Sequence, residues 1–198
     1  MTEETTTLIL DAALKLFNGD GTARVSTNHV AKAAGISPGN LYYHFRNKAE
    51  IIRALLERMI GEADTIWGSG RALRGGFDDL REILAHSLEI VWDYRFFYRE
   101  LAPLVQGDPI LRRRYSAIRR QRLTQISDLV QVFNDAGLMR GPRGAERDAL
   151  VTLSWMVGEF ALASAELDGA AARRASIEQS VEMLFALWRP YLTPSPGK

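Results

Sequence analysis

The chain has 198 residues, of which 46% are hydrophobic and 25% charged, as in ordinary globular proteins, and its formal net charge is only +1. Any affinity for nucleic acid must therefore come from a local patch of charge. The sequence has no cysteine, which excludes disulfides, thiolate zinc sites and cysteine nucleophiles and fits a reducing cytoplasm. No uninterrupted apolar run approaches about 18 residues and the first residues are polar and acidic, so we expect neither a membrane span nor a signal peptide.

The first predicted helix covers residues 5–18. Its apolar residues Leu10, Ala13, Leu14 and Phe17 stand at i, i+3, i+4 and i+7, which is one face of a helix. The run Asn-Gly-Asp-Gly at residues 18–21 breaks the pattern, so the helix should end there.

Two short helices joined by a tight turn are predicted next, between residues 26 and 45. Ser26 is a good N-cap for the first helix, because its hydroxyl can accept a bond from an otherwise unpaired backbone N–H, and Gly35 ends that helix. Ser37 caps the second helix, and Pro38 occupies its first position, where no N–H is needed. Helices joined in this way form a helix-turn-helix, whose second helix fits the major groove of DNA.

The second of these helices carries more aromatic side chains than it can bury. Leu41 and Phe45 are four residues apart and share one buried face. A helix this short cannot also bury Tyr42 and Tyr43, so some of these rings must be exposed or bound to a partner.

The charge of the same region suits a polyanion. No Asp or Glu occurs from Gly21 to Ala49, whereas two histidines and four basic residues do. The motif AxxAGIS at residues 31–37, followed by GNLYYHF at 39–45 and NK at 47–48, resembles the tetracycline-repressor (TetR) family of bacterial transcriptional regulators. The basic residues of the region are Arg24, Lys32, Arg46 and Lys48.

The resemblance implies which residues contact DNA. Ser26 and Thr27 correspond to phosphate contacts, whereas Asn28 and Asn40 occupy positions that can touch bases, where an amide suits adenine. Many relatives have a Lys or Gln that reaches a base where this chain has Pro38, so this position should contribute little to direct readout. The full predicted set is Ser26, Thr27, Asn28, Ser37, Pro38, Gly39, Asn40, Tyr42, Tyr43, His44 and Lys48, with Tyr42, His44 and Lys48 as phosphate anchors and Tyr43 on the backbone or a thymine methyl.

A longer helix should follow, from Asn47 as N-cap to about Trp67. Lys48 lies in its first turn, where the helix dipole disfavours a cation, and a phosphate contact would explain that choice. Residues 68–76 (GSGRALRGG) form the clearest linker in the chain. Every later segment has a helical pattern: residues 77–92, the aromatic stretch 92–104 with a break at Pro103, then 108–136, 145–167 and 171–188.

The sequence thus predicts an all-α protein of about nine helices. A helix-turn-helix head (residues 1–50) precedes a larger helical body (residues 51–198) for ligand binding and dimerisation.

The helix at residues 145–167 is apolar on two sides. Leu150, Leu153, Val157 and Ala161 line one side, and Met156, Phe160, Ala163 and Leu167 line the other. A helix of this kind is buried on two sides, either as a central core helix or against a twofold mate. The resemblance implies a homodimer through the last two helices, and helix-turn-helix proteins commonly read paired half-sites as dimers.

The aromatic cluster at residues 92–98 is either core packing or the wall of a ligand pocket between helices. The resemblance implies such a pocket in the body, for a small-molecule effector that is largely apolar or aromatic. The candidate pocket residues are His86, Trp92, Phe97, Phe133, Trp155 and Glu159.

Two further features leave alternatives open. His86, spaced three and four residues from acids, is a lone surface or core histidine or half of a metal pair, and we expect no metal or cofactor. Residues 112–122 contain six arginines, which form a solvated face, a second nucleic-acid surface, or a contact with an anionic ligand or membrane.

These features favour a cytoplasmic, ligand-responsive repressor that binds a palindromic operator as a dimer and is released by a small molecule. An enzyme is disfavoured, because no nucleophile with a base, metal set or phosphate loop is present. A helical adaptor without DNA is disfavoured by the acid-free segment.

Overall fold

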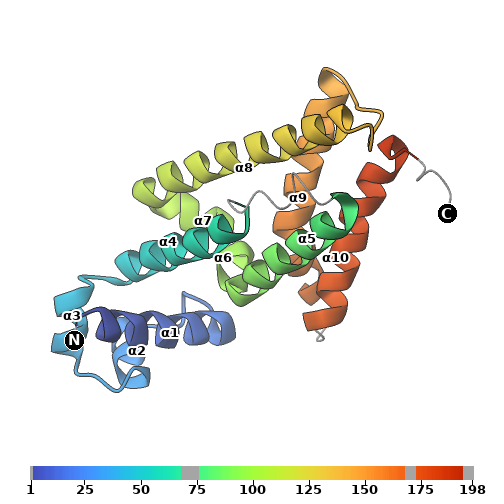
Figure 1. The fold of residues 1–198 in the computed structure, drawn as a ribbon. Coiled ribbons are helices and arrows are strands. Elements are labelled where there is room, and N and C mark those ends of the chain that lie inside the picture. Colours follow the sequence, from blue (N-terminus) through green and yellow to red (C-terminus); the bar gives the residue numbers. More distant parts are fainter. Residues whose placement is uncertain (1, 68–75, 168–172, 194–198) are drawn as a thin grey trace. The chain divides into compact units, whose positions relative to one another are not determined.

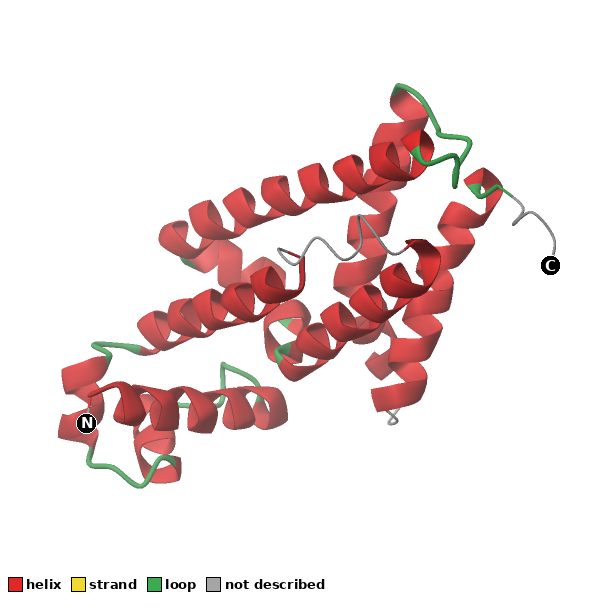
Figure 2. Cartoon of the chain, viewed as in Figure 1, coloured by secondary structure: helices red, strands yellow, loops and turns green. Residues whose placement is uncertain are grey.

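The structure is a computed structural model that describes residues 2–67, 76–167 and 173–193. Within these ranges it contains ten α-helices, one short 3₁₀ helix and no strand (Figures 1 and 2), which confirms the all-α prediction. The helices are α1 Thr2–Asp20, α2 Thr27–Ala33, α3 Pro38–His44, α4 Lys48–Trp67, α5 Gly76–Asp93, α6 Arg95–Arg99, α7 Leu101–Gly107, α8 Pro109–Asp135, α9 Ala145–Leu167 and α10 Arg173–Trp188, followed by the 3₁₀ helix Arg189–Tyr191.

Some predicted helix boundaries were wrong. The first helix is longer at both ends than residues 5–18, and the aromatic stretch forms two short helices where one was expected. The break between those two falls at Glu100 and not at Pro103, which lies in the first turn of α7, where a missing N–H costs no helical bond. Most of the predicted linker, residues 68–75, lies outside the described residues.

Packing divides the chain into two compact units. Unit 1 comprises Met1–Ala63 and Asp93–Arg112, and unit 2 comprises Asp64–Trp92 and Arg113–Lys198. The helix-turn-helix therefore shares a unit with α6 and α7, which come far later in the chain. The predicted boundary at residue 50 divides the chain by role, whereas these units divide it by packing.

The end of α1 is joined to α6 and α7 by side chains that bind backbone. The amide of Asn18 donates to the carbonyl of Asp93 at 2.7 Å and accepts from the N–H of Phe96 at 3.0 Å. The Glu100 carboxylate accepts from both the N–H and the hydroxyl of Thr22. Phe17 packs on Phe96, with ring centroids 5.2 Å apart, so apolar contact and hydrogen bonds act together here.

Gly21 lies beside this junction in a conformation that favours glycine. Its φ is +78°, and a Cβ at this position would lie 2.9 Å from Oε1 of Glu100. The turn after α1 therefore depends on the absence of a side chain.

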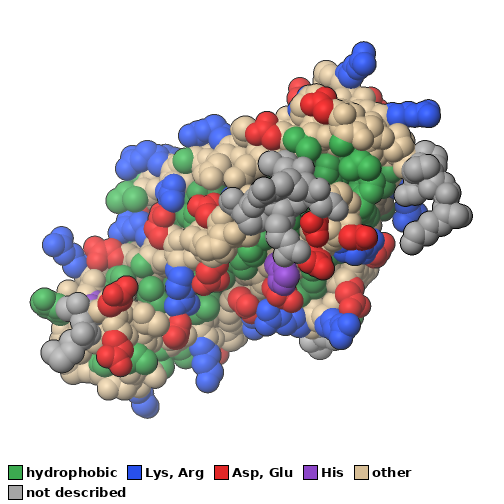
Figure 3. All heavy atoms as spheres, viewed as in Figure 1, with side chains coloured by type: hydrophobic (Ala, Val, Ile, Leu, Met, Phe, Trp, Pro, Cys, Tyr) green, Lys and Arg blue, Asp and Glu red, His purple; other side chains and the backbone are tan. Residues whose placement is uncertain are grey.

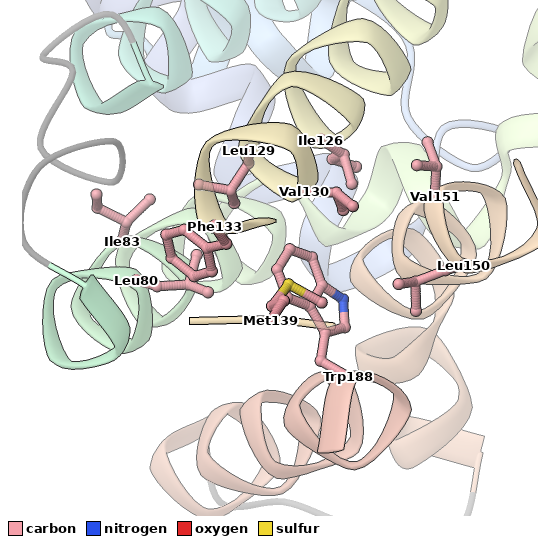
Figure 4. Packing of buried hydrophobic residues seen from close by; sticks show 10 residues of the cluster. All are labelled: Leu80, Ile83, Ile126, Leu129, Val130, Phe133, Met139, Leu150, Val151 and Trp188. Carbon is pink, nitrogen blue, oxygen red and sulfur yellow. The ribbon is translucent and has the colours of Figure 1, made fainter. Parts of the chain in front are cut away.

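Unit 2 has its largest apolar cluster around Phe133 of α8 and Trp188 of α10 (Figure 4). The two rings meet edge to face with centroids 6.1 Å apart, and Phe77 of α5 meets Phe133 in the same way at 5.1 Å. The indole N–H of Trp188 donates to Ser154, whose hydroxyl donates to the carbonyl of Leu150. The polar atoms of this buried tryptophan and serine are thus satisfied within the core.

Helix α9 is buried on one side and exposes apolar side chains on the other. The buried side is formed by Leu150, Val151, Ser154, Glu159 and Leu162. The prediction placed Leu153 on the same side as Leu150, but Leu153 is exposed together with Met156, Phe160 and Leu167. The error is understandable because both sides of this helix are apolar in sequence.

By length and composition alone, α9 is the one described helix that could cross a membrane. It also packs along α10 and buries a glutamate, Glu159, and the core helix of a soluble protein passes the same test. The finding is weak evidence for a membrane segment.

Candidate nucleic-acid interface and effector site

Helix α2 begins with a reciprocal cap. The Ser26 hydroxyl accepts from the N–H of His29 at 3.2 Å, and Nδ1 of His29 accepts from the N–H of Ser26 at 3.4 Å. In a capping box a Glu or Gln normally makes the second bond, and here the His29 imidazole takes its place.

Helix α3 begins and packs as the sequence predicts. The Ser37 hydroxyl accepts from the N–H of Asn40 at 3.2 Å, and Pro38 is the first helical residue. Leu41 and Phe45 are buried, whereas Tyr42 is 48% and Tyr43 78% exposed. The expectation that this helix cannot bury all its large side chains is therefore confirmed.

Two side-chain contacts fix the orientation of α3. The hydroxyls of Thr27 and Tyr42 lie 3.0 Å apart and join α2 to α3, and Thr6 of α1 lies 3.2 Å from Nδ1 of His44. Neither contact was predicted, since the partners are 15 and 38 residues apart. Thr6 is thus a structural support of the interface that the sequence motif does not contain.

Lys48 has partners inside the protein. Its Nζ donates to the carbonyls of Thr22 at 2.5 Å and Val25 at 3.0 Å, in the segment between α1 and α2. These bonds explain a cation at the start of α4 without DNA, so the helix-dipole argument alone no longer requires a phosphate contact. The N-cap of α4 is Asn47 as predicted, since its side chain accepts from the N–H of Glu50 at 3.0 Å.

The exposed polar side chains of α2 and α3 come from the acid-free segment. Asn28, Lys32 and Asn40 are exposed, as are Arg24 and Arg46 on either side of the two helices. Elsewhere, basic and acidic side chains are interspersed over the face that Figure 3 shows. This segment therefore differs from the rest of the chain in having basic residues without acidic ones. A chain with a net charge of only +1 needs such a local patch to bind DNA.

The six candidate pocket residues do not form one group. Phe97 is buried in unit 1, and the other five belong to unit 2. Within unit 2, His86 is exposed on α5, Phe133 is at the centre of the main apolar cluster, and Trp92 packs on a second cluster around Leu162. Trp155 packs against the cluster of Phe133 and lies one turn from Glu159 on α9, so the structure brings these candidates closest to one group.

Glu159 is a buried acid with an unforeseen partner on α8. It is 4% exposed, and the hydroxyl of Tyr115 donates to its Oε1. Burial raises the pKa of Glu159, while the hydrogen bond from Tyr115, the nearby Trp155 indole and the charge of Arg119 oppose that rise. Tyr115 lies within the arginine cluster, and its sequence neighbours gave no sign of this role.

The arginine cluster of residues 112–122 divides into exposed and buried members. Arg112, Arg113, Arg114 and Arg120 are exposed, whereas Arg122 is buried and forms an ion pair with Asp64 at 2.5 Å. Arg122 also donates to the side chain of Gln125 at 2.8 Å. One predicted surface residue is thus part of the interior of unit 2.

Comparison with known proteins identifies the family. A profile described as "Bacterial transcriptional repressor" (TetR) matches residues 67–196, and one described as "Bacterial regulatory proteins, tetR family" matches residues 9–55. This chain belongs to the TetR family. Members of the family are transcriptional regulators and not enzymes, so the predicted class of protein is confirmed.

Individual TetR-family relatives match different parts of the chain. The regulator AcrR of Shigella flexneri is 39% identical over 90 residues, which cover 44% of this chain and 41% of AcrR. TtgR of Pseudomonas putida is 40% identical over 57 residues, or 29% of this chain and 27% of TtgR. These matches span well under two thirds of the relatives, so their activities do not transfer directly.

Two solved structures match nearly the whole chain. A TetR-family regulator from Marinobacter aquaeolei VT8 has a TM-score of 0.85 at 30% identity and covers 96% of this chain and 91% of its own. A complex of SmeT with triclosan has a TM-score of 0.66 at 22% identity, covering 97% of this chain and 93% of its own. At that identity the second likeness supports the fold alone.

Proposed function

We propose that this TetR-family regulator is a repressor that binds a palindromic DNA operator as a homodimer and is released by a small molecule. The observation that carries the proposal is the pair of capped helices α2 and α3, which expose amides, phenols and cations from a segment without a single acid. DNA carries a high density of negative charge, which such a surface can meet without repulsion.

The roles of the exposed residues follow from their chemistry. Asn40 can donate to and accept from one base edge, as adenine recognition requires. We assign phosphate anchoring to Tyr42, whose hydroxyl lies beside that of Thr27, and to His44, which lies beside Thr6. Phosphate contacts position a protein without reading sequence. We assign the head to residues 1–50 and the ligand-binding and dimerisation body to residues 51–198.

A homodimer is supported by the outer side of α9. Met156 and Phe160 are 48% and 41% exposed there, and one turn of helix separates them. Exposed apolar side chains that form a stripe mark contact surfaces. Two copies joined by a twofold axis could present their α3 helices to successive major grooves, about 34 Å apart.

Release by a ligand would then be a matter of differential affinity. The dimer would have one arrangement whose heads fit the operator and another whose heads are wrongly spaced for it. A molecule that binds the second arrangement more tightly lowers operator affinity by up to the ratio of its two affinities. Proteins of similar fold have been solved with triclosan and with choline, and we propose a small-molecule effector for this chain as well.

Selection of binding sites from random DNA, followed by titration at two salt concentrations, tests the proposal. We expect a palindromic site whose affinity falls steeply between about 50 and 200 mM salt, because phosphate contacts release counterions. Absence of DNA binding at about 50 mM salt would contradict the proposal and favour a helical adaptor.

A further inference from the structure

Unit 2 buries a carboxylate that has no ion pair. Glu159 of α9 is 4% exposed, and within the described part of the chain its polar neighbours are the Tyr115 hydroxyl and the Trp155 indole, with no Lys or Arg nitrogen at ion-pair distance. Glutamate is almost never fully buried unless it is paired.

The surroundings of Glu159 leave its negative charge only partly balanced. Tyr115 supplies a neutral donor, and Arg119 acts through its field without forming an ion pair. The indole Nε1 of Trp155 is buried and lacks a bond of normal geometry, although it lies close enough to lower the pKa of Glu159. The buried ions of ordinary cores are fully satisfied, as Arg122 is by Asp64 and Gln125 nearby.

The side chains beside Glu159 indicate what would complete the site. Tyr115 bonds the carboxylate through its phenol and the Trp155 indole lies beside it, so two aromatic residues flank the negative charge. Aromatic faces attract cations, and quaternary ammonium ligands are commonly recognised in this way. A metal ion is a poor fit, since no group of three or more His, Asp or Glu occurs among the described residues.

We propose that Glu159, Tyr115 and Trp155 bind the cationic group of an organic ammonium ligand. The inference rests on the proposed function in one respect, namely that this ligand is the effector of the body. Glu159 supplies the charge, and the two aromatic residues distinguish an alkylated ammonium from an inorganic cation.

The test compares a cation with its neutral analogue on the full-length protein without DNA. Benzyltrimethylammonium and 2,2-dimethyl-1-phenylpropan-1-ol share the phenyl ring and the bulky head, and the first carries the positive charge. Calorimetric titration of the wild-type protein should give an affinity for the cation at least tenfold above that for the alcohol. Equal affinities, or no binding of the cation at millimolar concentration, overturn the inference.

Variants assign the preference to Glu159. Glu159→Gln should lower the cation affinity about tenfold or more and leave the alcohol affinity within twofold. Glu159→Asp, which keeps the charge, should retain part of the preference. Glu178→Gln removes an exposed carboxylate of α10 and should leave the preference unchanged. A preference that survives Glu159→Gln, or disappears with Glu178→Gln, contradicts the assignment.

Operator titration separates this inference from the proposed function. Failure of the protein to bind DNA refutes the regulator alone, because the calorimetry contains no DNA. If the protein binds DNA and the cation, addition of the ammonium compound should lower operator affinity. An unchanged operator affinity at saturating cation overturns the effector role.

Discussion

At the scale of single residues, the exposed side chains of α3 divide into those that can read a base and those that can hold a phosphate. Asn40 has a free side chain in the described part of the chain, since its bond to Ser37 uses only backbone N–H. Tyr42 instead has its hydroxyl next to Thr27. The two residues should therefore respond differently to truncation.

Asn40→Ala should reduce operator affinity by about 1–3 kcal/mol and leave random-sequence DNA nearly unaffected, because one bidentate base contact is lost. Tyr42→Phe should weaken both together, since a phosphate carries no sequence information. Titrations at fixed salt with the selected operator and with shuffled DNA measure the difference. Equal losses on both DNAs for Asn40→Ala would show that specificity resides elsewhere, in Asn28, Tyr43 or DNA shape.

Lys48 should act both in stability and in DNA binding. Lys48→Met removes a charged donor from the carbonyls of Thr22 and Val25, so we expect the free energy of unfolding to fall by about 1–3 kcal/mol. If Lys48 also contacts a phosphate, the dependence of log affinity on log salt should decrease by about 0.9. Urea unfolding measures the first effect and titration across salt the second. A stability loss with an unchanged slope would confine Lys48 to its structural role.

The buried carboxyl of Glu159 should make stability depend on pH. Burial raises its pKa above the ordinary value of 4.5, so the folded chain binds the carboxyl proton of Glu159 more tightly than the unfolded chain does. The stability that this tighter proton binding contributes is fully present below about pH 4.5 and is lost as the pH rises through the folded-state pKa. Glu159→Gln cannot ionise and should therefore raise the melting temperature more at pH 7.5 than at pH 4. An equal shift at both pH values would show that ionisation of Glu159 does not matter to stability.

At the scale of helices, the caps were predictable because they are local. Ser26, Ser37 and Asn47 each accept a bond from the N–H group three residues later, as their sequence positions predicted. The junction at Glu100 was not predictable, because its partner Thr22 is 78 residues away. The same holds for the candidate site, where Tyr115 meets Glu159 across 44 residues. Sequence periodicity also could not decide which apolar side of α9 faces the core.

Asn18 is the clearest element-scale test of how α1 is joined to α6. Asn18→Ala leaves the carbonyl of Asp93 and the N–H of Phe96 without their partner, and we expect a loss of about 1–3 kcal/mol. Lys15→Ala, at an exposed position of the same helix, should change stability by less than about 0.5 kcal/mol. Chemical unfolding of the three proteins provides the measurement. A loss for Asn18→Ala no larger than that for Lys15→Ala would show that the junction does not depend on this amide.

At the scale of the whole molecule, the outer side of α9 is the surface on which we expect a second copy to bind, because it exposes large apolar side chains. Ala161 and Ala165 of this helix are half-buried, so an arginine at either position would also disturb packing within one chain. Phe160 is the better position, because its ring is already exposed.

Phe160→Arg should convert a dimer to monomers in sedimentation while the helical circular dichroism is retained. Operator affinity should then fall on the order of 100-fold or more, because the two heads no longer bind as one molecule. Ile110→Arg, at an exposed apolar position of α8, is the matched control and should leave sedimentation unchanged. A dimer that survives Phe160→Arg would place the interface on another surface.

The close approach of Glu100 to Gly21 also bears on which sequences this fold can accept. A side chain at residue 21 would strain a backbone with φ of +78° and displace the carboxylate that binds Thr22. Gly19, two residues earlier in α1, has nothing within 4 Å of an added Cβ and an ordinary helical backbone. In a library of all single substitutions, glycine should persist at residue 21 under selection for folding. Alanine at residue 19 should instead be enriched, because it favours the helix by roughly 0.5–1 kcal/mol. Two neighbouring glycines would thus have opposite mutational tolerance.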